Sequence, residues 1–357
     1  MPTVDIIIKN GTVVDGSGAP AFSADVGITG DRIALIGPNP NARAGRVIDA
    51  DGLVVAPGFI DMMGQSEYHL LVDPRGMSKI MQGVTTEITG EGASVAPRYG
   101  PAAEKPRDWL RTYGIEVDWV TIPEYFSRLE RQGIGLNLGT YVGAAQLRGC
   151  VVGLDDRPPT EIELAKMKWI AGEAMKDGAF GLSSALQYVP GSYASTEELI
   201  ALAQAVVPYG GIYATHQRSE GDRLDESFDE VLTIAQRAQI SVEIFHLKAA
   251  YRRNWGKMPG VLERIVAARE AGLDITADVY PYAAASTGLA NCLPAWARAG
   301  GDDAMQARLA DEPTRGRIRK EINANEPGWE NLFVGSGGAD GIQISAVANA
   351  SLNHFLG

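Results

Sequence analysis

Two histidines occupy matching places in the predicted secondary structure. The chain has 357 residues and only four histidines, and His216 and His246 each end a short apolar segment, 211–216 and 241–246, that is typical of a β-strand. Neighbouring strands lie about 5 Å apart, so both imidazoles can reach one metal ion. Imidazole is a common zinc ligand. The pattern favours a metal site, although a single histidine is more often a core or surface residue.

The segments around these histidines predict a repeated strand–helix pattern. His216 and His246 are separated by about 30 residues, as are His246 and Asp278, which is the length of one βαβ unit. Such units build a parallel barrel or a doubly wound sheet. We predict strands at 53–60, 84–89, 135–141, 179–183, 211–216, 241–246 and 273–279, and helices at 196–207, 224–238 and 258–271. Thr196 is the expected N-cap of the first of these helices.

The first fifty residues have a different pattern. Short Val- and Ile-rich runs alternate with turn residues, including a predicted turn at Asn10-Gly11. We therefore expect two domains: 1–52 as the N-terminal part of a small β-sandwich, and 53–357 as the (β/α) part.

Composition narrows the class of protein. The net charge of −12 and the pI of about 4.9 disfavour nucleic acid and anionic membranes as partners. The two cysteines, Cys150 and Cys292, do not suggest a disulfide scaffold. No leader or membrane-spanning apolar run is visible. We expect a soluble cytoplasmic protein, with a processed secreted form as the alternative; the oligomeric state stays open.

Several short sequence motifs, in their order and spacing, resemble those of one enzyme family. They lie at 8–18, 55–61, 83–86, 188–194, 213–222, 245–250, 254–257, 277–282 and 285–289. Together they are similar to the N-acyl-D-amino-acid deacylase (D-aminoacylase) branch of the amidohydrolase superfamily. The resemblance implies an α/β fold, a (β/α)₈ TIM-type barrel with a small β-sandwich built from both chain ends. It also implies hydrolysis of a small-molecule N-acyl-D-amino acid by zinc-activated water, with an aspartate of the eighth strand as base.

The resemblance assigns three metal ligands. His216 and His246 match the family's two later histidine ligands. The family's third ligand is usually a cysteine in a Gly-Asn-Cys-Gly word, which here reads Gly-Glu-Gly-Ala at 90–93. Glu91 is the natural substitute because carboxylate oxygen also binds zinc; the alternative is a solvated loop glutamate.

Substrate contacts are carried over in the same way. Lys248 matches the position that holds the substrate carboxylate, and Tyr188, Tyr280 and Ser286 match positions of the substrate pocket. A surface role for the lysine and a packing role for the tyrosines remain open alternatives.

The chain departs from the family at the first strand. The usual His-x-His is replaced by Met63 and Gln65, and neither side chain is a good zinc ligand. His69 is out of phase, and we interpret it as structural. We therefore expect one zinc ion rather than two.

The second departure concerns the end of the barrel. After residue 279 we find no eighth strand, and we do not assign Asp340 as the base. We expect a C-terminally truncated barrel whose catalytic aspartate lies beyond Gly357, with poor stability and little turnover. The remaining alternatives are another amidohydrolase, of dihydroorotase-like or dipeptide-cleaving type, and an inactive truncated barrel.

Overall fold

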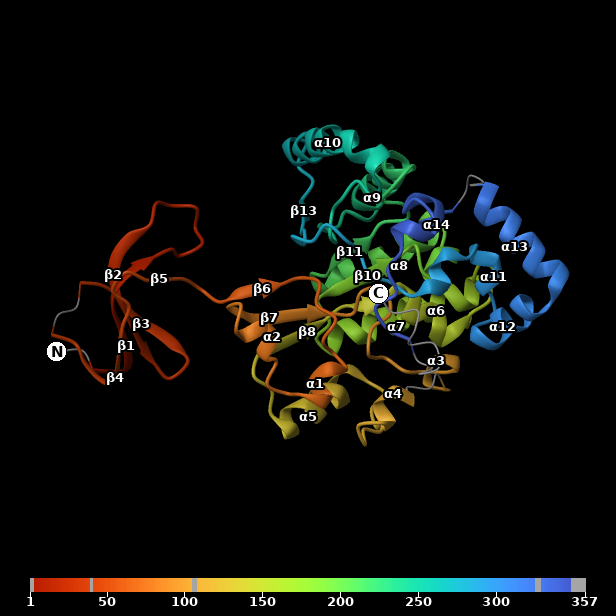
Figure 1. The fold of residues 1–357 in the computed structure, drawn as a ribbon. Helices are drawn as coiled ribbons and strands as arrows, with labels where there is room; N and C mark the ends of the chain where they lie inside the picture. Colours follow the sequence, from red (N-terminus) through yellow and green to blue (C-terminus); the bar gives the residue numbers. More distant parts are fainter. Residues whose placement is uncertain (1–2, 39–40, 105–107, 325–328, 348–357) are drawn as a thin grey trace. The chain divides into compact units, whose positions relative to one another are not determined.

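A computed structural model describes residues 3–38, 41–104, 108–324 and 329–347 (Figure 1). Its packing divides the chain into two units. The first comprises Met1–Ile60 with Gly83–Thr85, and the second comprises Asp61–Gln82 with Thr86–Gly357.

The first unit contains a five-stranded sheet. Its strands are β1 (Thr3–Val13), β2 (Phe22–Thr29), β3 (Arg32–Gly37), β4 (Arg43–Asp49) and β5 (Val54–Val55). They are ordered β3-β2-β1-β4, and β5 also pairs with β1. Alternate residues of β1 and β2 face a small apolar cluster that contains Val13, Ala24 and Val26. The predicted turn at Asn10-Gly11 is wrong: β1 runs through it with an irregularity, where Asn10 adopts a φ of 64°.

Two further sheets precede the proposed site, and the larger one, built of parallel strands, carries both predicted histidines. One sheet has the order β13-β12-β11-β10-β9, and the other has the order β6-β7-β8. Their bounds are β6 (Phe59–Asp61), β7 (Val84–Thr89), β8 (Asn137–Thr140), β9 (Val142–Gly143), β10 (Gly181–Ala185), β11 (Ile212–His216), β12 (Val242–Ile244) and β13 (Ile275–Ala277). Six predicted strands are confirmed. The seventh prediction, 53–60, is divided between β5 and β6 because residues 56–58 belong to neither strand.

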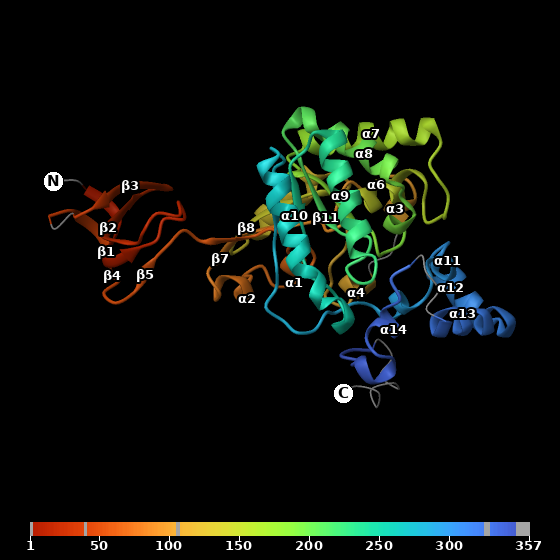
Figure 2. The same ribbon diagram turned by 90° about the horizontal axis from the view of Figure 1, so that it is seen from above.

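Amphipathic helices cover these strands. The longer ones are α5 (Ile122–Gln132), α6 (Ala144–Val151), α7 (Glu161–Lys176), α8 (Thr196–Val206), α9 (Leu224–Ala238) and α10 (Met258–Glu270). Helices α7, α8 and α9 lie side by side, and α8 packs against β10 and β11 (Figure 2). Leu199, Leu202 and Val206 give α8 its buried face, at a helical spacing. The three predicted helices are confirmed, but Ser195, not Thr196, caps α8: its side chain accepts from the Glu198 N–H at 3.2 Å.

The remaining helices are short or follow β13. They are α1 (His69–Val72), α2 (Met77–Ile80), α3 (Pro101–Glu104), α4 (Asp108–Arg111), α11 (Ala295–Arg298), α12 (Asp302–Ala310), α13 (Glu312–Ala324) and α14 (Leu332–Gly335). Between β13 and residue 347 the described chain contains helices and loops but no strand. Asp340 lies there in a single 3₁₀ turn, Ala339–Gly341. None of the helices in the described ranges is long and apolar enough to span a membrane.

Candidate metal centre

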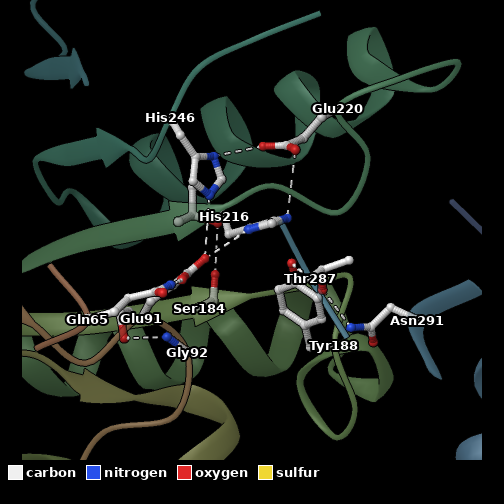
Figure 3. Close-up of polar contacts among 12 residues, drawn as sticks. Gln65, Glu91, Gly92, Ser184, Tyr188, His216, Glu220, His246, Thr287 and Asn291 are labelled. Carbon is white, nitrogen blue, oxygen red and sulfur yellow. Dashed lines mark hydrogen bonds and ion pairs between the residues drawn. The ribbon is translucent and has the colours of Figure 1, made fainter. Parts of the chain in front are cut away.

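The ends of three parallel strands bring Glu91, His216 and His246 together (Figure 3). His216 is the last residue of β11, His246 comes two residues after β12, and Glu91 comes two residues after β7. Since neighbouring parallel strands end on the same edge of a sheet, His216 and His246 lie side by side, and Glu91 joins them from the end of β7 in the other sheet. The backbone at His246 is unusual, with a φ of 38°, and its N–H donates to the Asp278 carboxylate. Such positive φ values are uncommon outside glycine and cluster at functional sites.

The geometry of the cluster suits one metal ion. The Oε1 atom of Glu91 lies 2.9 Å from His216 Nδ1 and 3.5 Å from His246 Nε2. Tetrahedral zinc with bonds of about 2.0–2.1 Å separates its ligand atoms by roughly 3.3 Å. The two imidazoles are nearly perpendicular, with centroids 4.5 Å apart. One ligand atom from each residue falls within 4.8 Å of the others, so a small shift of Glu91 accommodates an ion.

The charged side chains of the cluster are buried, so their protonation states depend on one another. The side chains of Glu91, His216 and His246 are at most 9% exposed. Burial raises the pKa of Glu91, but the hydrogen bonds and charges of both histidines outweigh it and hold this pKa well below its usual range. The carboxylate is therefore ionised at neutral pH and available to a cation.

A second carboxylate, Glu220, lies behind the histidines. Its Oε1 is 2.9 Å from His246 Nδ1 and 2.6 Å from Lys248 Nζ, and its Oε2 is 3.9 Å from His216 Nε2. Burial raises the pKa of Glu220, yet the neighbouring cations lower it to about 2. An ionised Glu220 accepts a hydrogen bond from His246 Nδ1. If a metal ion were bound, this hydrogen bond would keep the proton on Nδ1 and leave the lone pair of Nε2 for the ion.

The sequence did not lead us to predict a role for Glu220, although this residue lies in the segment 213–222, which carries part of the family resemblance. The residue follows His216 by four positions on a loop, and only the three-dimensional path of that loop brings it to His246. Gln65 also reaches the centre: its Nε2 donates to Glu91 Oε2 at 2.6 Å. This contact holds one carboxylate oxygen and leaves Oε1 facing the histidines.

The other two residues of the first-strand region lie outside the cluster. Met63 packs with the apolar group formed by Ile88, Tyr141, Ala214 and Phe245. His69 begins α1, where its Nδ1 lies 3.3 Å from the Gln65 carbonyl oxygen. His69 does not belong to the group of possible ligands found in the described chain.

Three of the four predicted substrate contacts lie beside the centre. The Tyr188 ring packs edge-on to His216 with centroids 5.0 Å apart, and the Tyr280 ring lies 6.1 Å from that of His246. Lys248 Nζ is 2.6 Å from Glu220 and 5.4 Å from the Tyr280 centroid. Ser286 is exposed in the loop after β13, and in the described structure no hydrogen bond joins it to the cluster.

Comparisons with known proteins identify the relatives of this chain. The chain is 38% identical over 284 residues to a D-aminoacylase of Alcaligenes xylosoxydans xylosoxydans, covering 79% of this chain and 58% of that protein. It is 36% identical over 285 residues to an N-acyl-D-glutamate deacylase of the same organism, covering 80% and 58%. The chain thus spans less than two thirds of the length of these relatives. No family model matches it.

Solved structures give the same result. A crystal structure of N-acyl-D-glutamate deacylase from Bordetella bronchiseptica, complexed with zinc and a phosphonate inhibitor, superimposes with a TM-score of 0.72 at 34% identity, covering 78% of this chain and 59% of that one. A D-aminoacylase structure gives 0.71 at 36% identity, with the same coverage. Another D-aminoacylase structure is described as having a binuclear metal centre. By sequence and by structure, the chain belongs to the D-aminoacylase (N-acyl-D-amino-acid deacylase) family of amidohydrolases.

Proposed function

We propose that the chain acts as a zinc-dependent deacylase of small N-acyl-D-amino acids. The observation that carries the proposal is the buried convergence of Glu91, His216 and His246 on one point. Structural relatives that contain zinc, and that are named for this reaction, support it. The alternatives are another amidohydrolase, of dihydroorotase-like or dipeptide-cleaving type, and an inactive barrel.

One zinc ion is proposed, held by Glu91 Oε1, His216 Nδ1 and His246 Nε2. Three protein ligands are the usual set of a catalytic zinc site. Replacement of two expected histidines by Met63 and Gln65 favours one ion over two. Zinc, when bound, supplies Lewis-acid polarisation of an amide carbonyl and lowers the pKa of water.

The chain's own side chains orient these groups. Glu220 keeps the His246 proton on Nδ1, and Gln65 fixes the Glu91 rotamer through Oε2. The rings of Tyr188 and Tyr280 lie edge-on to His216 and His246, respectively. We propose that these tyrosines, Lys248 and Ser286 contact the substrate. We assign none of the residues that the structure describes as the general base.

The proposed architecture is a (β/α)₈-type barrel formed by 53–357, with 1–52 contributing to a small β-sandwich. The parallel order of β6-β7-β8 and β9 to β13, with helices between the strands, supports the barrel.

A hydrolysis assay tests the function. The purified chain is incubated with N-acetyl-D-methionine or its L-enantiomer, with zinc or with a chelator, and free amino acid is measured. Zinc-dependent release from the D-enantiomer supports the proposal, and its loss in His216→Asn assigns the release to this centre. Release from dihydroorotate or from dipeptides instead would assign another branch, and no zinc-dependent release from any of these would favour the inactive barrel.

A further inference from the structure

Glu330 lies against the turn that carries Glu220, although more than a hundred residues separate the two in the sequence. Its Oε2 accepts a hydrogen bond from Ser219 Oγ at 2.5 Å. Its Oε1 lies so close to Gly221 that a Cβ atom added to this glycine would be 2.4 Å away from it. Glu330 therefore contacts the residues on both sides of Glu220.

Ser219 connects this contact to the backbone of the turn. Because its hydroxyl proton is donated to Glu330, the lone pairs of Oγ are available to N–H groups. The N–H groups of Gly221 and Arg223 donate to this oxygen at 3.3 Å and 3.2 Å. Ser219 is only 6% exposed. The turn 219–223 is thus held by hydrogen bonds that converge on one buried hydroxyl.

Tyr251 packs on the other side of Glu330. Its hydroxyl is also hydrogen-bonded to the Glu330 carboxylate. Its ring lies against Gly221 and Gly335, where an added Cβ atom would be 2.6 Å and 2.3 Å from ring carbons. Tyr251 has a φ of 66°, a strained conformation for a residue with a side chain, which persists only where the surroundings enforce it. Glu330 and Tyr251 therefore hold each other against the turn.

Glu220 faces the metal centre from this turn (Figure 3). Its Oε1 lies 2.9 Å from His246 Nδ1 and 2.6 Å from Lys248 Nζ. Its carbonyl oxygen accepts from the Ala250 N–H at 2.6 Å. Since an N–H···O contact much beyond about 3.2 Å is no longer a good hydrogen bond, a small displacement of the turn would release His246.

The surroundings of Glu330 do not favour its charge. Burial raises its pKa, and the charges of Glu220 and Asp222 add to this effect. Hydrogen bonds from Ser219 and Tyr251 oppose it. A buried carboxylate is unfavourable for folding unless it is well paired, and residues that are unfavourable for folding are expected at functional positions. The contacts of Glu330 are therefore better explained by positioning than by stability.

We propose that Glu330 is a positioning residue of the metal centre: through two hydroxyl groups it fixes the turn 219–223, which keeps Glu220 in contact with His246 Nδ1. The inference rests on the proposed function, because this contact prepares His246 for a zinc ion. It also gives the segment after β13 a role at the centre, although Glu330 does not reach the proposed ligands itself.

A mutant cycle with zinc affinity as the readout tests the proposal. Loss of a residue that orients a metal ligand typically lowers affinity by about 10- to 100-fold, and we expect about 10-fold for Glu330→Ala because it acts through the turn. In the Glu220→Gln background the same substitution should cause no further loss, since the contact that it supports is already gone. Glu330→Gln retains the shape and one acceptor, so it should lose less. Glu321→Ala, which removes a carboxylate of α13 that accepts from Trp296 Nε1 at 2.7 Å, should bind zinc like the wild type.

Nuclear magnetic resonance follows the same contact in the zinc-free chain. The chain has only four histidines, so in a sample with isotope-labelled histidine the Nδ1–H of His246 is assigned by its change in Glu220→Gln. We expect this proton to exchange with water faster in Glu330→Ala than in the wild type, and Glu330→Gln to restore part of the protection. If Glu330→Ala does not fold, Tyr251→Phe, which removes one of the two hydrogen bonds, replaces it in both measurements.

Three results would overturn the proposal. They are an unchanged zinc affinity in a folded Glu330→Ala, an equal loss of affinity in both backgrounds, and an unchanged exchange rate of the His246 proton. Equal losses would mean that Glu330 acts on the fold as a whole and not through Glu220. A wild-type chain that binds no zinc refutes the proposed metal site alone, because proton exchange in the zinc-free chain still decides the role of Glu330.

Discussion

Replacing Glu220 with glutamine should weaken zinc binding although Glu220 is not a proposed ligand. The residue is ionised at neutral pH, because its neighbours lower its pKa to about 2. The substitution therefore removes a full negative charge next to His246 Nδ1, 2.9 Å away, with little change in shape. It also allows the glutamine amide to donate where His246 needs an acceptor.

The expected loss follows from the contacts of Glu220. Removing the carboxylate partner of a metal-bound histidine typically lowers metal affinity about 10- to 100-fold, which is about 1.4 to 2.8 kcal/mol. Lys248 Nζ, 2.6 Å from Glu220 and 2.8 Å from His246 Nδ1, would then lie beside the imidazole without a counter-charge. We therefore expect a loss near the upper end, and partial recovery in Glu220→Gln/Lys248→Met.

The assay is a competition titration of zinc against a chromophoric chelator. Glu197→Gln is the matched control, because Glu197 is 69% exposed and pairs with Arg237 on the surface. Its zinc affinity should equal that of the wild type. If Glu220→Gln binds zinc as tightly as the wild type does, Glu220 does not orient His246, and the reasoning is refuted.

Three other perturbations should give defined results. Zinc at about 100 times its Kd should raise the free energy of unfolding by about 2.7 kcal/mol. This gain should disappear in His216→Asn and in His246→Asn. If zinc shifts the melting temperature of these variants as much as that of the wild type, the ion binds elsewhere. Arg148→Met should lower the free energy of unfolding, measured in urea, by about 3–5 kcal/mol, because it leaves Glu198 as an uncompensated charge in a pair that is 0% and 3% exposed. The double variant Arg148→Met/Glu198→Met should lose less stability than Arg148→Met, and a larger loss would contradict this. Burial raises the pKa of Glu330, so its stabilising contribution is present below the unfolded pKa of about 4.3 and is lost as pH rises through the folded pKa. Glu330→Gln should therefore gain stability relative to the wild type as pH rises from roughly 4 to 7, and a constant difference in urea unfolding would contradict the shift.

Periodicity was sufficient to predict most of the elements that carry the centre. Short apolar runs that end in His216 and His246 read as strands because buried parallel strands are continuously apolar, and β11 and β12 lie there. Turn-forming residue types were a poorer guide to where strands end. Asn10-Gly11 has the composition of a turn, but pairing of β1 with both β2 and β4 keeps the strand continuous.

The network around the proposed ligands could not be predicted from spacing. Glu220 and Gln65 reach the centre through loops whose paths depend on long-range packing. The resemblance to a known family identified residue types at the site, whereas the contacts among them required coordinates.

Anomalous diffraction from crystals grown with zinc tests the central claim most directly. The account predicts one strong peak at the zinc absorption edge, within bonding distance, about 2.0–2.2 Å, of Glu91 Oε1, His216 Nδ1 and His246 Nε2. A peak bound by other residues, or no peak near these three side chains at saturating zinc, would contradict it.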